Sequence, residues 1–209
     1  GCTDAIQNRQ FISCVLNAEN GCENLRSITP AQQKKKVAVL GGGPAGLEAA
    51  RVAALRGHDV TLFEKTTALG GQLNIACIPP RKEEMRRATQ DLIRAVCKAG
   101  VQLRLAQAPT AEELKAAGFE AVINAVGAHS AAPRIPGSDH VNVADAWKIL
   151  AGEQQVYGTV AVIGGGMVGC ETAEYLAERG CKVSVVEMMD KIAAGESTTI
   201  LPTLLENYK

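Results

Sequence analysis

The pattern of apolar and polar positions changes sharply after the first 36 residues. Residues 1–36 are polar, show no sustained period and end in Pro30 and three consecutive lysines, so we predict a loop or linker there. A short apolar run from Val37, a glycine turn, an alanine-rich helix to about Arg56 and an apolar segment Asp59–Glu64 follow in order. This order predicts a β-α-β unit.

Further elements follow this first unit. Apolar residues recur at helical spacing between Glu83 and Ala99, which predicts a helix, and short apolar runs predict strands at Val101–Leu105 and Ala121–Ala125. The prolines and glycine of residues 133–137 then break regular structure. We therefore expect a domain crossing near this point.

The first pattern returns after Gly158. Six positions match at a constant offset of 123 residues, which pairs Gly41, Gly43, Gly46, Ala50, Gly57 and Glu64 with Gly164, Gly166, Gly169, Ala173, Gly180 and Glu187. A period this long indicates a duplicated functional unit, not a solenoid.

Each copy has the residues that a dinucleotide-binding turn needs. Gly41 allows the tight turn, Gly43 lets the backbone approach a pyrophosphate, and Gly46 lets helix and strand pack closely. The diphosphate then lies at a helix N-terminus, where free amides and the helix dipole favour negative charge. The acid that ends the next strand, Glu64, is placed to accept hydrogen bonds from ribose hydroxyls. The predicted contacts of the first copy are Gly41, Gly43, Pro44, Ala45, Gly46, Glu64 and Lys65.

The second copy repeats every element of the first. Glycines that merely permit helix packing would explain one such residue, but not two full sets with acids at equal distances. We therefore expect two bound dinucleotides. The predicted contacts of the second copy are Gly164, Gly166, Met167, Val168, Gly169 and Glu187.

Glu187 also bears on the choice of nicotinamide cofactor. A carboxylate placed for the ribose 2′-hydroxyl repels a 2′-phosphate, which favours NADH over NADPH. Lys182 and Lys191 lie nearby in the sequence and leave NADPH open, since a basic side chain could fold over a phosphate.

Composition narrows the class of protein without identifying it. Apolar residues make up 46% of the chain, and 22 basic residues balance 22 acidic ones, so neither nucleic acid nor a membrane surface is an expected partner. No apolar run approaches the roughly 20 residues that span a bilayer. No secretory signal is visible, and the seven cysteines have no disulfide-scaffold spacing, so we expect free thiols and a cytoplasmic protein.

These motifs together resemble the flavoproteins with two dinucleotide-binding domains. More narrowly, the chain is similar to the C-terminal half of the NADH:flavin oxidoreductases that include 2-enoate reductase, 2,4-dienoyl-CoA reductase and trimethylamine dehydrogenase. The resemblance covers nearly the whole chain and includes Gly70–Leu73, Asn124–Ala128, Ile135–Gly137 and the run from Val185 through Glu187 to Ala193. It implies FAD at the first glycine turn and NADH at the second, with Gly71, Gln72, Leu73 and Gly127 beside the FAD.

The resemblance also implies parts that this chain lacks. In the family an FMN-bearing (β/α)8 barrel reduces the substrate, and an iron-sulfur cluster lies between barrel and FAD. Cys2 and Cys14 match two of four cluster positions, but the first position would precede Gly1 and the third is Ile6. Four thiolates are the usual requirement, so we expect the cluster and FMN only in the intact parent.

The expected fold is α/β, with tandem Rossmann-like dinucleotide-binding units on parallel sheets, the second of them incomplete. We divide the chain into an iron-sulfur loop remnant and linker (1–36), an FAD-binding domain (37–145) and the first part of an NAD(P)H-binding domain (146–209). The chain ends in a helical pattern, Leu201–Lys209, and looks like a fragment.

The expected function is that of an FAD/NADH electron-entry module. Hydride passes from NAD(P)H to FAD, and the missing barrel reduces an α,β-unsaturated acid or thioester. A nucleotide-binding module and a fragment without turnover stay open as alternatives. No Cys-x-x-Cys lies near either unit, so a disulfide relay has no visible redox pair, and we assign no catalytic side chain.

Overall fold

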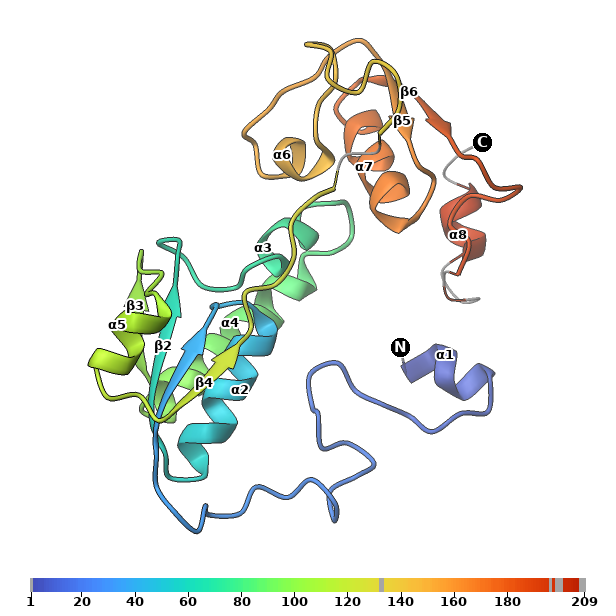
Figure 1. Ribbon diagram of the computed structural model, residues 1–209. Coiled ribbons are helices and arrows are strands. Elements are labelled where there is room, and N and C mark those ends of the chain that lie inside the picture. Colours follow the sequence, from blue (N-terminus) through green and yellow to red (C-terminus); the bar gives the residue numbers. More distant parts are fainter. Residues whose placement is uncertain (1, 132–133, 196, 198–200, 207–209) are drawn as a thin grey trace. The chain divides into compact units, whose positions relative to one another are not determined.

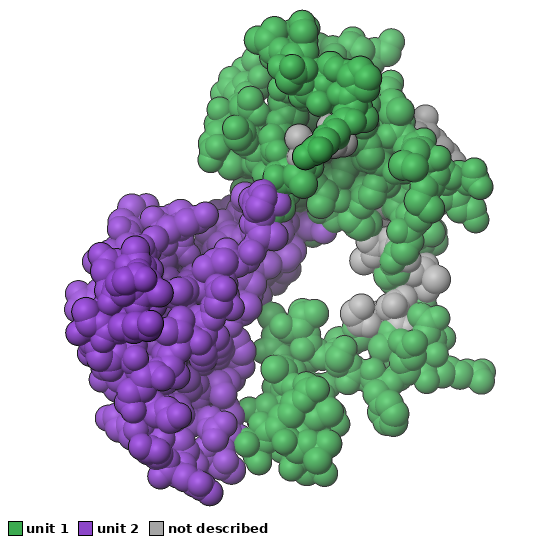
Figure 2. Space-filling model, in the orientation of Figure 1, with its two compact units in different colours: residues 1–27, 78–81, 130–209 green, residues 28–77, 82–129 purple. Residues whose placement is uncertain are grey.

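The computed structural model describes residues 2–131, 134–195, 197 and 201–206. The chain divides into two compact units, coloured separately in Figure 2. Unit 1 comprises residues 1–27, 78–81 and 130–209, and unit 2 comprises residues 28–77 and 82–129.

Unit 2 is built on a four-stranded parallel sheet (Figure 1). Its strands are β1 (Lys36–Leu40), β2 (Asp59–Glu64), β3 (Gln102–Leu105) and β4 (Ala121–Asn124), in the spatial order β3-β2-β1-β4. Val39 of the central strand pairs with Leu62 on one side and with Ile123 on the other. Because β1 has a neighbour on each side, its three middle residues are buried.

One face of this sheet is covered by two helices, α2 (Pro44–Leu55) and α4 (Glu84–Lys98). Successive residues of a strand point to opposite faces, so alternate positions of β1 and β2 meet these helices. The short helix α3 (Leu73–Ala76) precedes α4. The core contains Val37, Val39, Leu47, Ala50, Ala53, Val60, Leu62, Val96 and Val101.

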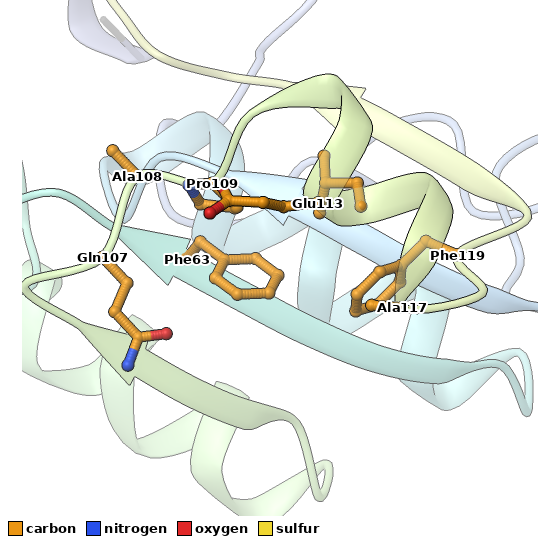
Figure 3. A pocket seen from close by; sticks show the side chains of 8 residues that line it. Phe63, Gln107, Ala108, Pro109, Glu113, Ala117 and Phe119 are labelled. Carbon is orange, nitrogen blue, oxygen red and sulfur yellow. The ribbon is translucent and has the colours of Figure 1, made fainter.

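The other face carries Phe63 and the short helix α5 (Ala111–Ala116). Thr110 caps α5 and forms a reciprocal capping box with Glu113. Phe63 meets Phe119 edge to face with ring centroids 5.8 Å apart. A cavity of about 380 Å³ remains between these rings and α5 (Figure 3), and it lies among residues other than those of the two glycine turns.

Unit 1 contains a second, smaller parallel sheet. Its strands β5 (Thr159–Ile163) and β6 (Lys182–Val186) pair in parallel. Helix α7 (Met167–Ala177) connects them in the sequence. Among the described residues this sheet has two strands, and both alternate between exposed and half-buried positions. The remaining helices of unit 1 are α1 (Cys2–Gln7), α6 (Ala146–Leu150) and α8 (Leu201–Glu206).

The predicted α/β fold with parallel sheets is confirmed, and the predicted strands and long helices appear within a residue or two of their expected bounds. One prediction was wrong, because Cys2–Gln7 forms α1 inside the segment expected to be a loop. Six residues are too few to show a helical period. The last residues of the predicted C-terminal helical pattern, 207–209, lie outside the described residues.

None of the helices in the described part of the chain has both the length and the apolar character needed to cross a membrane.

Candidate functional site

The first glycine turn joins β1 to α2. Gly41 has φ +108°, and a Cβ atom there would lie 2.2 Å from the carbonyl oxygen of Ala125. A Cβ atom on Gly46 would lie 1.9 Å from the carbonyl oxygen of Gly41. Since real Cβ atoms do not approach oxygen so closely, both positions require glycine, for the turn and for helix packing respectively.

Gly43 serves a different purpose. Its φ of −76° suits any residue, and the atom nearest to an added Cβ would be the Cα of Gly71 at 3.9 Å. Gly43 caps α2 with no side-chain hydrogen bond, and Pro44 and Ala45 begin the helix. The amides of the first helical turn are therefore available to an anion, as a bound pyrophosphate requires.

Glu64 ends β2 and fixes this turn from the other side. Its Oε2 accepts a hydrogen bond from the amide of Gly42 at 2.7 Å, and its Oε1 accepts from the amide of Thr66 at 2.8 Å. Burial alone would raise the pKa of Glu64, but the hydrogen bonds from Thr66 and Gly42, with the charge of Lys65, lower it below its ordinary value. The carboxylate stays ionised and keeps acceptor capacity for a ribose hydroxyl.

The second turn, between β5 and α7, repeats this geometry. Gly164 has φ +99°, and a Cβ on Gly169 would lie 1.9 Å from the carbonyl oxygen of Gly164. Gly166 caps α7 without a side-chain hydrogen bond, and an added Cβ there would meet no atom of the described part of the chain within 4 Å. Met167 and Val168 begin the helix, as Pro44 and Ala45 do in the first copy.

Glu187 occupies the position of Glu64. Its Oε1 accepts a hydrogen bond from the amide of Met189 at 2.9 Å, and its Oε2 accepts from the amide of Gly165 at 2.6 Å. These backbone hydrogen bonds lower the pKa of Glu187 below its ordinary value. Each acid thus accepts a hydrogen bond from the second of the three consecutive glycines in its own turn, Gly42 or Gly165. The spacing of the motif had predicted only a contact with ribose.

The structural repeat extends beyond the acids. The amide of Gly70 donates to the carbonyl of Gly42 at 2.8 Å, and 123 residues later the amide of Ala193 donates to the carbonyl of Gly165 at 2.6 Å. The side chains of Leu69 and Ile192 lie beside Gly42 and Gly165 in the same way. The repeat of the two backbone hydrogen bonds could not be predicted from the sequence, because any residue type can form a backbone hydrogen bond.

We call each glycine turn, with the helix N-terminus and the acid beside it, a cradle: the first is formed around Gly41–Gly46 and Glu64, the second around Gly164–Gly169 and Glu187. In the first cradle a further loop packs against the glycine turn. The Gly70–Leu73 loop packs its backbone on the glycine turn, since a Cβ on Gly71 would lie 2.8 Å from the Cα of Gly43. Nε2 of Gln72 donates to the carbonyl of Ala128 at 3.0 Å, next to Gly127. The structure thus brings together Gly43, Gly71, Gln72 and Gly127, which the sequence had placed in three separate motifs. Leu73 begins α3, and Lys65 is exposed just after β2.

The cysteines predicted as iron-sulfur ligands lie in the N-terminal segment. Sγ of Cys2 donates to the carbonyl of Ser13 at 3.4 Å, which brings Cys2 to the backbone beside Cys14. Within the part of the chain that the structure describes, no group of three or more His, Cys, Asp or Glu side chains could hold a metal ion. The ligand role of Cys2 and Cys14 in a larger parent stays a prediction.

Two glycine turns of this geometry, in tandem on parallel sheets, place the chain among known proteins. Residues 35–207 match the family model described as pyridine nucleotide-disulphide oxidoreductase. The chain belongs to this family. The predicted resemblance to flavin-dependent reductases is confirmed by the relatives.

The relatives are larger proteins than this chain. The chain is 58% identical to bilirubin reductase of Mediterraneibacter gnavus over 209 residues, all of this chain and 33% of that protein. It is 46% identical to NADH oxidase of Thermoanaerobacter brockii over 87% of this chain and 29% of that protein. The structure of a 2-naphthoyl-CoA reductase matches 99% of this chain and 32% of that one, with a TM-score of 0.93 and 32% identity. The chain therefore spans about a third of the length of these relatives and corresponds to their FAD/NAD(P)-binding module.

Proposed function

We propose that this chain is the electron-entry module of a larger flavin oxidoreductase, with FAD at the first glycine turn and NADH at the second. The observation that carries the proposal is the pair of equivalent cradles. Each combines an uncapped helix N-terminus, a glycine whose missing side chain leaves room for a ligand, and an ionised carboxylate. This is the set of groups that a dinucleotide requires.

The difference between the cradles supports the assignment of the two cofactors. In unit 2 the loop at Gly71 packs against Gly43, and Gln72 reaches Ala128, so a ligand there has a second wall. In unit 1, among the residues that the structure describes, no atom lies within 4 Å of an added Cβ at Gly166. An enclosed cradle suits a cofactor that stays bound, and an open one suits a cofactor that exchanges at every turnover.

Three positions around Glu187 support NADH over NADPH. Lys182 begins β6 and lies at the opposite end of the strand from the acid, roughly 16 Å away at about 3.3 Å per residue. Met188, which follows the acid directly, is 97% exposed and carries no charge. Glu187 itself is ionised, so a 2′-phosphate would face a carboxylate without a basic partner at either position. Lys191 is the remaining nearby cation.

The residues of this chain position and orient the cofactors and do no covalent chemistry in this proposal. The amides of α2 and α7 bind the two pyrophosphates, Glu64 and Glu187 bind ribose hydroxyls, and Gly127 allows the backbone to approach the flavin. When bound, FAD supplies the chemistry of accepting a hydride and releasing electrons singly.

The fate of the electrons lies in the rest of the parent protein. We propose that the rest of the parent would hold an iron-sulfur cluster and an FMN-bearing barrel, which would supply electron transfer from FAD to a conjugated acceptor such as an α,β-unsaturated acid or thioester. The likeness to a structure named for 2-naphthoyl-CoA supports a thioester, and the relative at 58% identity is named for bilirubin. Relatives this similar carry names of different substrates, so the parts of the parent beyond this module set the choice of acceptor. The cytoplasmic location stays a prediction.

An anaerobic titration tests the proposal. The purified chain and its full-length parent are incubated with FAD, freed of excess cofactor and titrated with NADH, while flavin absorbance is followed at about 450 nm. We expect bleaching by NADH at concentrations where NADPH has little effect. Gly166→Ala should weaken the response to NADH without releasing FAD, whereas Gly43→Ala should release FAD.

Two other outcomes would contradict the proposal. Bound flavin that NADH cannot bleach in either protein would make the chain a nucleotide-binding module without hydride transfer. Failure of both proteins to retain flavin would contradict the assignment of the first cradle.

A further inference from the structure

The side chain of Gln72 joins two segments that are far apart in the sequence. Its Nε2 donates to the carbonyl of Ala128 at 3.0 Å, and the same nitrogen would lie 3.5 Å from a Cβ on Gly127. One segment is the Gly70–Leu73 loop, and the other follows β4. Both were predicted to lie beside the flavin, and this hydrogen bond joins them.

The loop that carries Gln72 is held in place by other contacts. The amide of Gly70 donates to the carbonyl of Gly42 at 2.8 Å, which ties the loop to the glycine turn. Nδ2 of Asn74 donates to the carbonyl of Leu69 at 3.0 Å and closes the loop on itself. The position of the loop therefore does not depend on the side chain of Gln72.

The partner segment is held firmly at its beginning. The amide of Ala125 donates to the carbonyl of Leu40 at 2.8 Å and continues the pairing of β4 with β1. Two residues later Gly127 adopts φ +73°, where the chain turns out of the sheet direction. The hydrogen bond from Gln72 acts just beyond this turn, so the fixed loop orients the segment, and not the reverse.

We propose that Gln72 is a positioning residue of the FAD cradle, which holds the backbone of Gly127 and Ala128 at the flavin through the carbonyl of Ala128. The proposal rests on the proposed function in taking FAD as the ligand of the first cradle. In the second cradle the position 123 residues after Gln72 is Gly195, which has no side chain to donate a hydrogen bond. The hydrogen bond from Gln72 to Ala128 thus belongs to the cradle that we propose retains its cofactor.

Gln72→Glu tests this role with almost no change of shape. The carboxylate cannot donate a hydrogen bond and would face the carbonyl oxygen of Ala128. Gln72→Ala removes the side chain altogether and serves as a second variant. Gln90→Glu, which makes the same charge change at an exposed position of α4, is the matched control.

The first measurement uses the flavin-free chain. Hydrogen exchange at the amides of residues 126–128 should be faster in both Gln72 variants than in the wild type and in Gln90→Glu, while exchange in β1 stays unchanged. Loss of one exposed hydrogen bond leaves global stability nearly intact. Unchanged exchange at residues 126–128 would overturn the proposal.

The second measurement uses the flavin-loaded protein. We expect the dissociation constant for FAD to rise about three- to tenfold, which corresponds to the loss of one hydrogen bond. The visible circular dichroism of the bound flavin should change, while the KM for NADH stays that of the wild type. Weaker FAD binding without faster exchange in the flavin-free chain would show that Gln72 contacts the cofactor directly, and this would overturn a positioning role.

The experiment also separates this inference from the proposed function. A wild-type protein that takes up FAD beside variants with unchanged affinity would overturn the role of Gln72 alone. A wild-type protein that takes up no FAD would overturn both.

Discussion

The two glycine-turn units contain the same local structure in different surroundings. Both strands that lead into the turns contain the tripeptide Val-Ala-Val, at residues 37–39 and 160–162. Ala38 and Val39 are completely buried in β1, whereas Ala161 is exposed and Val162 half-buried in β5. Yet both units share the hydrogen bond from Gly42 or Gly165 to the acid. They also share the close packing of Gly46 or Gly169 on the carbonyl of the first glycine.

The comparison shows that the geometry of the turn does not depend on how deeply its strands are buried. The contacts that the two turns share join residues no more than about 30 positions apart, so they form in a two-stranded sheet as well as in a four-stranded one. Burial depends on neighbours, and β1 lies between β2 and β4 under two helices, while β5 pairs with β6 alone among the described residues. Cradle geometry can therefore be complete where burial is not.

The largest effect is expected from the glycine that packs helix on strand. Gly46→Ala would place a Cβ 1.9 Å from the carbonyl oxygen of Gly41, in the unit with the larger core. We expect the free energy of unfolding to fall by at least about 3 kcal/mol, because the clash is with backbone. Urea denaturation followed by far-ultraviolet circular dichroism measures it. Gly43→Ala is the control, since its Cβ has room, and equal stability losses in the two variants would contradict the different roles of these glycines.

The next effect separates the two units directly. Gly41→Ala combines a strained φ with a 2.2 Å approach to the carbonyl oxygen of Ala125, whereas Gly164→Ala has the strained φ but its new Cβ meets no described residue within 4 Å. We expect a loss of about 2–3 kcal/mol for the first and about 1 kcal/mol for the second. Trp147, the single tryptophan of the sequence, lies in unit 1, so its fluorescence reports the unfolding of that unit. Equal losses would mean that the segment after β4 does not constrain the first turn.

A smaller effect concerns the acids and depends on pH. The pKa of Glu64 is lowered in the folded protein, so its stabilising contribution is present above the ordinary carboxyl value of 4.5 and is lost as the pH falls through the lowered value. A glutamine side chain has a single acceptor oxygen and cannot replace both contacts, so we expect Glu64→Gln to cost about 1 kcal/mol at neutral pH and progressively less in acid. Glu187→Gln should show the same trend with a smaller amplitude, because Glu187 is more exposed. Denaturation curves between neutral and acidic pH measure both, and a constant difference from wild type across this range would contradict the linkage.

The smallest effect tests the second face of the unit 2 sheet. Thr110→Ala removes the capping box of the short, largely exposed helix α5, and we expect a loss of about 0.5 kcal/mol. Hydrogen exchange should increase in α5 while β1 stays protected. The sheet face under α5 would then be more exposed to solvent, as the strands of unit 1 are. Unchanged exchange in α5 would show that packing against Phe63 and Phe119, and not the cap, holds the helix.

Much of the fold could be predicted because its signals are local. The strand Asp59–Glu64 has the bounds that its apolar run predicts, and the long helix of residues 84–98 is within one residue of expectation. The short helices α1 and α5 were not predicted, because they span too few residues to show a period. The division into domains and the contacts of individual site residues with cofactors stay predictions.

What the sequence by itself determined is the pair of glycine turns, since the positive φ of the first glycine, the packing of the third glycine on its carbonyl and the hydrogen bond of the acid all arise within one β-α-β unit of fixed spacing. What only the tertiary structure decided is how each cradle is completed. The contact of Gln72 with Ala128 and the hydrogen bond from Ala193 to Gly165 join residues that no motif connects. A backbone carbonyl accepts a hydrogen bond whatever its side chain, so such contacts leave no pattern in the sequence and appear only when the chain has folded.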